Sequence, residues 1–328
     1  MITRPLGRTG CEVSEIGFGA WGLGGTMWRG VADREGRKAL HLALDQGVTF
    51  IDTALAYGDG HSERTVASVL SERLGDGGVV VATKIPPLDE VWPGLPGTPL
   101  NETFPPDHIV DCVERSLRNL EIEAIQIEQF HVWHDAWLDG PYWPETLAVM
   151  RKLQKEGKVL HWGLSVNDHR PGTALRLLKD PLIATVQVIY NIYDRSAEGE
   201  LFDLVRTKGL GVIVRVPLDE GALTGKITSG TTFPDGDWRH RYFRGERKAE
   251  AAAHAARLAE LLGAEAEDLP ELALRFCLSR SEVSTVIPGM RLVEHVRPNT
   301  CVSDGRKLSA EMLTQLRSHA WEKNWYEG

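Results

Sequence analysis

The chain has 328 residues, 42% of them hydrophobic and 25% charged, so it is long enough to bury a large core. Its net charge of −9 argues against a nucleic-acid partner. No apolar run reaches the roughly 18 residues that a membrane helix needs, and the first residues lack the apolar core of a signal peptide. The four cysteines are too far apart to predict a metal site or a disulfide framework. We therefore expect a cytoplasmic protein.

Short segments rich in Val and Ile alternate with helical patterns along the whole chain. Strands are expected at 15–19, 48–51, 79–82, 125–131, 159–165, 183–188, 212–216 and 283–287. Helices are expected at 34–46, 61–74, 107–120, 144–156, 172–178, 198–208, 247–262, 270–279, from 292 onward and at 309–325. Eight strand–helix units in one chain of this length predict a single α/β domain over residues 1–328, a (β/α)8 barrel.

Three segments fall outside this alternation. Residues 1–14 contain Gly7 and Gly10 and predict a small hairpin that caps the bottom of the barrel. The loop 86–106 contains seven prolines, which disfavour a helix or a central strand, and the loop 217–244 is polar and rich in glycine. Both loops follow predicted strands, so we expect them at the rim where barrels place their sites, as lids or binding loops.

Two glycine patterns resemble nucleotide-binding motifs. Residues 17–22 satisfy G-x-G-x-x-G, but no helix is expected before about Asp33, which argues against a Rossmann site. Residues 221–226 resemble a P-loop that is one residue short, with Ile227 in place of Ser or Thr. The pattern therefore does not predict a Walker A site, although a glycine loop beside a phosphate group remains open.

Two further patterns do not predict a ligand site. His131 and His134 lie close in sequence, but no third ligand at a suitable spacing accompanies them, so no metal site is predicted. Residues 238–244 mix basic and aromatic side chains, and in an acidic chain we interpret them as a lid or surface loop.

Polar residues stand at the ends of three neighbouring predicted strands. Asp52 ends the second strand and Tyr57 follows in its loop, while Lys84 ends the third strand and His131 the fourth. Taken alone, Asp52 and Tyr57 are better explained as a helix-capping carboxylate and a half-buried phenol than as a reactive pair. Lys84 in a barrel mouth needs a partner, and Asp52 is the obvious one. The four residues on one rim therefore predict an acid–base site.

Short motifs in a fixed order span nearly the whole chain. They are LGRTG at 6–10, IGFG at 16–19, FIDTA at 50–54, YG at 57–58, SE at 62–63, ATK at 82–84, FH at 130–131, GLS at 163–165, YN at 190–191, PL at 217–218, GALTGK at 221–226, STVIPG at 284–289 and Asn299. Together they make the chain resemble the aldo-keto reductase family. The resemblance implies an oxidoreductase that uses NAD(P)H, without a Rossmann domain, to reduce an aldehyde or ketone by hydride transfer.

The resemblance also implies a role for each of the four polar residues. Tyr57 is the general acid that protonates the carbonyl oxygen, and His131 orients the carbonyl group and donates or relays a proton. A free tyrosine has a pKa of about 10, so we expect the Lys84 ammonium to lower the phenol pKa. Asp52 holds Lys84 in place.

A cofactor site follows from the same resemblance, with NADPH preferred and NADH possible. Its residues are Gly19, Ala20, Trp21, Asp52, Ser165, Asn167, Gln187, Arg215, Pro217, Leu218, Gly221, Leu223, Lys226, Gly289, Met290, Arg291, His295 and Asn299. Arg291 suits the 2′-phosphate of NADP, because a guanidinium forks onto phosphate oxygens.

Three positions depart from the family pattern. Val166 separates Ser165 from Asn167, Arg215 stands where an aromatic residue often stacks on the nicotinamide, and His295 stands where Gln is common.

Aromatic residues are expected to wall the substrate pocket. Trp21, Tyr57, His131 and Trp133 are assigned to it, and such walls suit aldehydes, ketones, quinones and sugars alike. Two alternatives to a carbonyl reductase stay open. One is an NAD(P)-dependent sugar (aldose) dehydrogenase, and the other is a nucleotide-binding regulatory subunit of the channel-accessory type.

Overall fold

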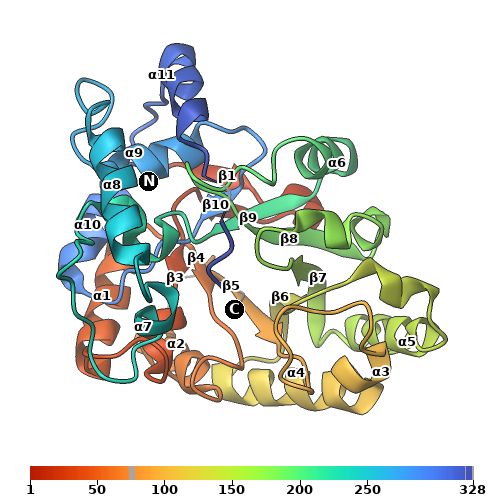
Figure 1. Ribbon diagram of the computed structural model, residues 1–328. Helices are drawn as coiled ribbons and strands as arrows, with labels where there is room; N and C mark the ends of the chain where they lie inside the picture. The colour runs from red at the N-terminus through yellow and green to blue at the C-terminus, as the bar shows by residue number, and fades with distance from the viewer. Residues whose placement is uncertain (74–77, 322, 327–328) are drawn as a thin grey trace.

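The computed structural model describes residues 1–73, 78–321 and 323–326, and its centre is a barrel of eight parallel strands (Figure 1). In barrel order the strands are β3 (Phe18–Gly19), β4 (Phe50–Asp52), β5 (Val80–Ile85), β6 (Ile125–Phe130), β7 (Val159–Ser165), β8 (Ile183–Ile189), β9 (Gly211–Arg215) and β10 (Thr285–Val286). Parallel bridges from Ile16 to Val286 and from Gly19 to Gly289 close the barrel. The predicted (β/α)8 barrel is confirmed.

Helices surround the barrel, each with an apolar face against it (Figure 1). They are α1 (Asp33–Asp45), α2 (His61–Ser71), α4 (Pro106–Leu120), α5 (Trp143–Lys155), α6 (Glu200–Lys208), α8 (Arg247–Ala259), α9 (Leu269–Leu278) and α10 (Val293–Cys301). In α4, Ile109, Val113 and Leu117 recur at helical spacing and are buried. Burial of each side chain contributes about 1.5–3 kcal/mol to the free energy of folding. No helix among the described residues is long and apolar enough to cross a membrane.

The rim loops carry short elements of their own. These are η2 (Trp21–Gly24), α3 (Leu100–Thr103), η3 (Asp135–Asp139), η4 (Pro171–Ala174), η5 (Leu177–Lys179), η6 (Asp219–Thr224) and α7 (Arg239–Tyr242). The single turn α3 lies in the proline-rich loop, where no helix was expected. The predicted helix at 172–178 is instead the two 3-10 turns η4 and η5, and the last predicted strand is reduced to β10. The helix predicted at 61–74 ends at Ser71, and Leu74 lies outside the described residues.

The carboxyl-terminal helix predicted at 309–325 is confirmed as helical chain over residues 310–319 and is wrong beyond His319. Helix α11 (Ala310–Gln315) and the 3-10 turn η7 (Leu316–His319) are followed by non-helical chain, with residue 322 outside the described part. The physical reason is long-range contact, which overrides local propensity. The backbone N–H of Trp321 donates to the Tyr193 carbonyl (2.9 Å), and the Trp321 ring stacks on His254 with 3.7 Å between ring centroids.

The amino-terminal hairpin is present as predicted. Strands β1 (Thr3–Pro5) and β2 (Glu12–Ser14) pair antiparallel and are joined through the 3-10 turn η1 (Gly7–Thr9). Arg4 pairs with Glu15 and donates to the carbonyls of Leu278, Arg280 and Val283. The hairpin thereby ties the start of the chain to the barrel bottom.

Replacing Gly7 with Ala is expected to destabilise the protein by about 2 kcal/mol more than the matched change Gly10→Ala. Both glycines have positive φ, +54° and +77°. A Cβ on Gly7 would lie 2.1 Å from the backbone nitrogen of Gly211, whereas a Cβ on Gly10 meets no described atom within 4 Å. Urea unfolding of the two variants measures the difference, and equal stabilities would contradict the close packing of η1 on β9.

Candidate active site

Three consecutive strands bring together the rim cluster, which we define as Asp52, Tyr57, Lys84 and His131. Asp52 is the last residue of β4, Lys84 lies near the end of β5, and His131 directly follows β6. Because the carboxyl ends of parallel strands meet at one rim, these side chains converge there. The Lys84 Nζ donates to Asp52 Oδ1 (2.6 Å), to the Thr53 carbonyl (2.8 Å) and to the Tyr57 hydroxyl (3.2 Å).

The Lys84 ammonium is fully buried yet charged. Burial lowers the pKa of Lys84, but Asp52 and the Tyr57 phenol outweigh burial and raise it above the ordinary value. Asp52 is fixed from its other side, since Gln187 Nε2 donates to Asp52 Oδ2 (2.6 Å). The cluster therefore holds one ammonium in a fixed place beside the Tyr57 hydroxyl.

The Tyr57 phenol stays protonated in this structure. Burial raises its pKa above the ordinary value, Lys84 acts in the opposite direction, and Asp52 adds to the increase. Lys84 thus acts in the expected direction, but the expected net lowering of the phenol pKa is wrong because burial prevails. A protonated phenol beside an ammonium is able to release a proton and leave a stabilised phenolate.

His131 is the second proton-carrying group of the cluster. Its ring lies edge-on to the Tyr57 ring, with 5.7 Å between centroids. Burial lowers the pKa of His131 well below its ordinary value, and the charges of Lys84 and Arg215 lower it further, so the imidazole is neutral. Its Nδ1 is buried and has no hydrogen-bond partner in the described part of the chain.

Aromatic side chains form the mouth around this cluster, but not all are those predicted. Trp21 lies 6.2 Å from Tyr57, ring centroid to centroid, and contacts Trp28 (5.6 Å) and Trp238 (6.0 Å). Trp238 belongs to the segment 238–244, so its interpretation as a lid fits this contact.

Trp92, for which no role was predicted, contacts the rim cluster, whereas Trp133 does not line the mouth. Trp133 is fully buried against Phe130 and Trp137, so the expectation that it walls the pocket is wrong. Trp92 is 47% exposed and meets His131 edge-on at 4.7 Å. Sequence reasoning missed Trp92, because no local pattern shows that the single tryptophan of the proline-rich loop turns toward the mouth.

Two residues expected at the nicotinamide end of the cofactor site, Ser165 and Asn167, differ in the contacts that they make within the protein. Ser165 ends β7 on the same rim as Asp52. Asn167 donates to the Gly94 carbonyl and accepts from the Gly94 N–H, both at 3.0 Å. Asn167 therefore anchors the proline-rich loop through one donated and one accepted hydrogen bond.

Arg215, at the end of β9, is held by a residue that sequence reasoning missed. Its Nη2 donates to Asp168 Oδ1 (2.6 Å) and to the Val166 carbonyl (3.0 Å). The guanidinium lies close enough to the rim cluster to affect the pKa values of Tyr57 and His131. Arg215 is thus a second fixed cation near the cluster.

The other end of the expected cofactor site is cationic. Burial lowers the pKa of His295, the charges of Lys226 and Arg291 lower it further, and the Glu294 carboxylate 3.7 Å away acts in the opposite direction, so these side chains lie near one another. Arg291 donates to the Arg29 carbonyl (2.8 Å), and its guanidinium lies 5.3 Å from the Trp28 ring centroid.

The other residues expected at the cofactor follow the last two barrel strands, β9 and β10, which set the position of their backbone. Gly289 pairs with Gly19 at the barrel seam, Met290 and Asn299 are buried, and the loop after β9 carries Pro217, Leu218, Gly221 and Leu223.

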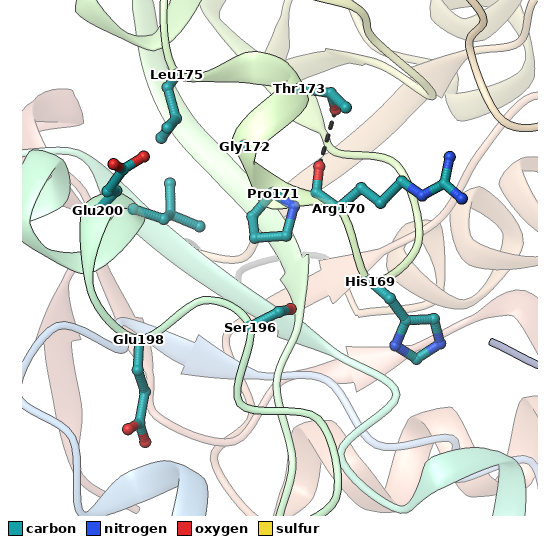
Figure 2. Close-up of a pocket in the computed structure, with 10 residues that line it drawn as sticks. His169, Arg170, Pro171, Gly172, Thr173, Leu175, Ser196, Glu198 and Glu200 are labelled. Carbon is teal, nitrogen blue, oxygen red and sulfur yellow. Dashed lines mark hydrogen bonds between the residues drawn. The ribbon is translucent and has the colours of Figure 1, made fainter. Parts of the chain in front are cut away.

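A separate cleft of about 460 Å³ lies between residues 169–175 and 196–201, after strands β7 and β8 (Figure 2). Pro171 and Leu201 supply apolar surface, and Glu198 and Arg170 supply charge. None of the four residues of the rim cluster lines it. The cleft is therefore distinct from the rim cluster.

A (β/α)8 barrel with a Tyr–Lys–Asp–His cluster on strands β4 to β6 defines a class of barrel enzymes with acid–base chemistry at the carboxyl-end rim. The Aldo/keto reductase family model matches residues 15–320. The chain belongs to the aldo/keto reductase family and is an aldo-keto reductase enzyme, an oxidoreductase of a family that uses NAD(P)H.

Individual relatives cover most of the chain. Aldo-keto reductase YhdN of Bacillus subtilis (strain 168) is 34% identical over 240 residues, 72% of this chain and 67% of that protein. NADH-specific methylglyoxal reductase of Escherichia coli (strain K12) is 31% identical over 308 residues, 90% of this chain and 91% of that protein. The structure of the glycerol dehydrogenase AKR11B4 from Gluconobacter oxydans matches with a TM-score of 0.77 at 27% identity, over 97% of this chain and 94% of that one.

Proposed function

We propose that this protein reduces an aldehyde or ketone group of a small molecule with NADPH, and that Tyr57 protonates the carbonyl oxygen. The observation that carries the proposal is the Lys84 ammonium, buried between the Asp52 carboxylate and the Tyr57 hydroxyl. When bound, the cofactor supplies the hydride.

The rim cluster supports proton transfer in that direction. The phenol is protonated at rest, and the ammonium 3.2 Å from its oxygen stabilises the phenolate that forms as the proton leaves. Asp52 keeps Lys84 charged and oriented. The neutral His131 imidazole has one N–H, which orients the carbonyl oxygen by a hydrogen bond. Burial of these groups strengthens each of these interactions, because the local dielectric constant is low.

The residues at the opposite end fit a nicotinamide dinucleotide. Lys226 and Arg291 supply two positive charges near His295, and such charges suit phosphate oxygens. A Cβ on Gly289 would meet no described atom within 4 Å, so the backbone there is open to a ligand. Arg291 would hold the 2′-phosphate, which supports NADPH over NADH.

Replacing Arg291 with Met is expected to raise the Kd for NADPH at least about tenfold and to change the Kd for NADH little, because a charge-assisted hydrogen bond contributes about 1.5–3 kcal/mol. The matched control is Arg297→Met, an exposed arginine of helix α10, which begins two residues after Arg291. Fluorescence titration with both cofactors measures the effect. Equal losses for NADPH and NADH, or tighter binding of NADH by the wild-type protein, would contradict the assignment of Arg291.

The direction of reaction is a separate question, since a glycerol dehydrogenase has a similar structure. We expect cofactor consumption with a panel of aldehydes and ketones to exceed cofactor reduction with polyols and aldoses. Absorbance at the nicotinamide band follows both directions in one assay. If the wild-type protein turned over cofactor with neither panel, the proposed function would be wrong.

A further inference from the structure

Residues 323–326 run from the α11 side of the molecule into the mouth of the barrel, and we call this segment the latch. Figure 1 shows the dark-blue chain passing from α11 toward the middle of the barrel. Trp325 is 6% exposed and packs on Tyr242 and Phe243, with ring centroids 5.4 and 5.9 Å apart. Arg247 donates to the Trp325 carbonyl (3.1 Å). The latch is therefore a packed part of the structure.

The Tyr326 ring reaches the residues that surround the reaction site. It stacks on Trp238, with 5.5 Å between centroids and 20° between ring planes, and Trp238 in turn contacts Trp21. Its hydroxyl donates to Glu220 Oε1 (2.5 Å). Burial lowers the pKa of Arg215, but Asp168 and then the Tyr326 phenol raise it, which places that phenol near the guanidinium. The ring thus lies between Trp238, Glu220 and the end of β9.

The latch is clamped to the loop after β9 at two consecutive acidic residues. Lys323 Nζ lies 2.9 and 2.8 Å from the two carboxylate oxygens of Asp219, and the two side chains are only 6% and 1% exposed. Tyr326 bonds the next residue, Glu220. If the latch left this position, the carboxylates of Asp219 and Glu220, which are buried in this conformation, would lose their hydrogen-bond partners.

The clamped loop is also strained. Val216, Asp219 and Glu220 have positive φ values of 55°, 48° and 55°, a region that side chains other than glycine rarely adopt. Such strain persists only where surrounding contacts hold it, and it is concentrated at ligand clamps and switch segments. Here the Asn191 amide holds the Val216 carbonyl (2.9 Å), and the latch holds the two acids.

We propose that the latch occupies the entrance of the cofactor site and has to leave it before NAD(P)H binds. This rests on the proposed function, because the loop after β9 and Arg215 are the groups that would hold the pyrophosphate and nicotinamide. The Tyr326 ring and the clamps of Lys323 use the same loop and the same strand end. Cofactor binding therefore competes with the latch. The apparent Kd for the cofactor equals the Kd of the open form divided by the fraction of molecules in which the latch is open.

The central test is Tyr326→Phe, which keeps the stacked ring and removes only the hydrogen bond to Glu220. A weaker latch raises the open fraction, so we expect the Kd for NADPH to fall about tenfold. In stopped-flow mixing, the observed binding rate should reach a plateau at high NADPH, set by latch opening, and the plateau should rise in the variant. The matched control is Tyr142→Phe, which changes an exposed tyrosine of another rim loop. We expect this control to leave the Kd for NADPH and the plateau rate unchanged.

Hydrogen exchange of the wild-type protein gives a second readout that needs no variant. Peptides covering residues 323–326 should exchange faster when NADPH is bound. Unchanged or weaker NADPH binding in Tyr326→Phe, or slower exchange with NADPH, would overturn the latch while leaving the proposed function intact. If the wild-type protein bound neither NADPH nor NADH, the proposed function would fail and the latch as a cofactor gate would fail with it.

Discussion

Tyr57→Phe is expected to lower kcat for carbonyl reduction by about 10²–10⁴-fold, the contribution of a positioned general acid. The phenyl ring fills the same space, so the contacts with Trp21 and His131 remain. Only the proton and the bond to Lys84 are lost. Steady-state assays with NADPH measure the change, and fluorescence titration should show nearly unchanged cofactor binding.

A buried tyrosine elsewhere in the chain is the control for this experiment. Tyr190 is fully buried, and its hydroxyl donates to Glu198 (2.8 Å), so Tyr190→Phe also removes one hydrogen bond. We expect it to cost about 1 kcal/mol of stability and to leave kcat unchanged. Equal kcat in wild type and Tyr57→Phe would exclude the phenol as the proton donor. Equal losses in the two variants would indicate a structural effect.

Lys84→Met is expected to destabilise the protein by about 3–5 kcal/mol, because it leaves the buried Asp52 carboxylate without its cation. It should also reduce kcat strongly, since the phenolate of Tyr57 loses the ammonium that stabilises it. Urea unfolding gives the free energy of unfolding, and the cofactor assay gives kcat.

The double variant Lys84→Met with Asp52→Leu separates the two effects. Removing both charges takes away the unpaired carboxylate, so most of the lost stability should return while kcat stays low. If the single variant were as stable as wild type, Lys84 and Asp52 would not form a charged pair in solution. If the double variant recovered activity, the ammonium would not be needed for proton transfer.

The barrel and the rim cluster were predictable because both follow from local pattern. Val- and Ile-rich segments such as β5 and β8 are buried on both faces, and the helices between them carry apolar residues at regular spacing. In a parallel barrel every strand ends on the same rim, so Asp52, Lys84 and His131 had to meet once the strand ends were known.

Loop conformation was not predictable in the same way, because it depends on contacts between distant segments. Trp92 was missed and Trp133 was wrongly placed at the mouth, since both depend on how the proline-rich loop folds over His131 and Phe130. Asn167, expected at the cofactor, bonds Gly94, 73 residues away, a contact that no local pattern predicts. A helix predicted through residue 325 gave way to a segment held by Asp219 and Glu220.

The sequence by itself determined the barrel, the family and the four residues of the rim cluster, because strand periodicity and residue order specify which side chains stand at strand ends. Only the tertiary structure decided which side chains of that cluster are protonated and which chain segment lies at the mouth of the barrel. Burial, which no local pattern reports, keeps Tyr57 protonated despite the neighbouring ammonium. Packing of chain segments about a hundred residues apart brings Tyr326 to Glu220 at the mouth of the barrel.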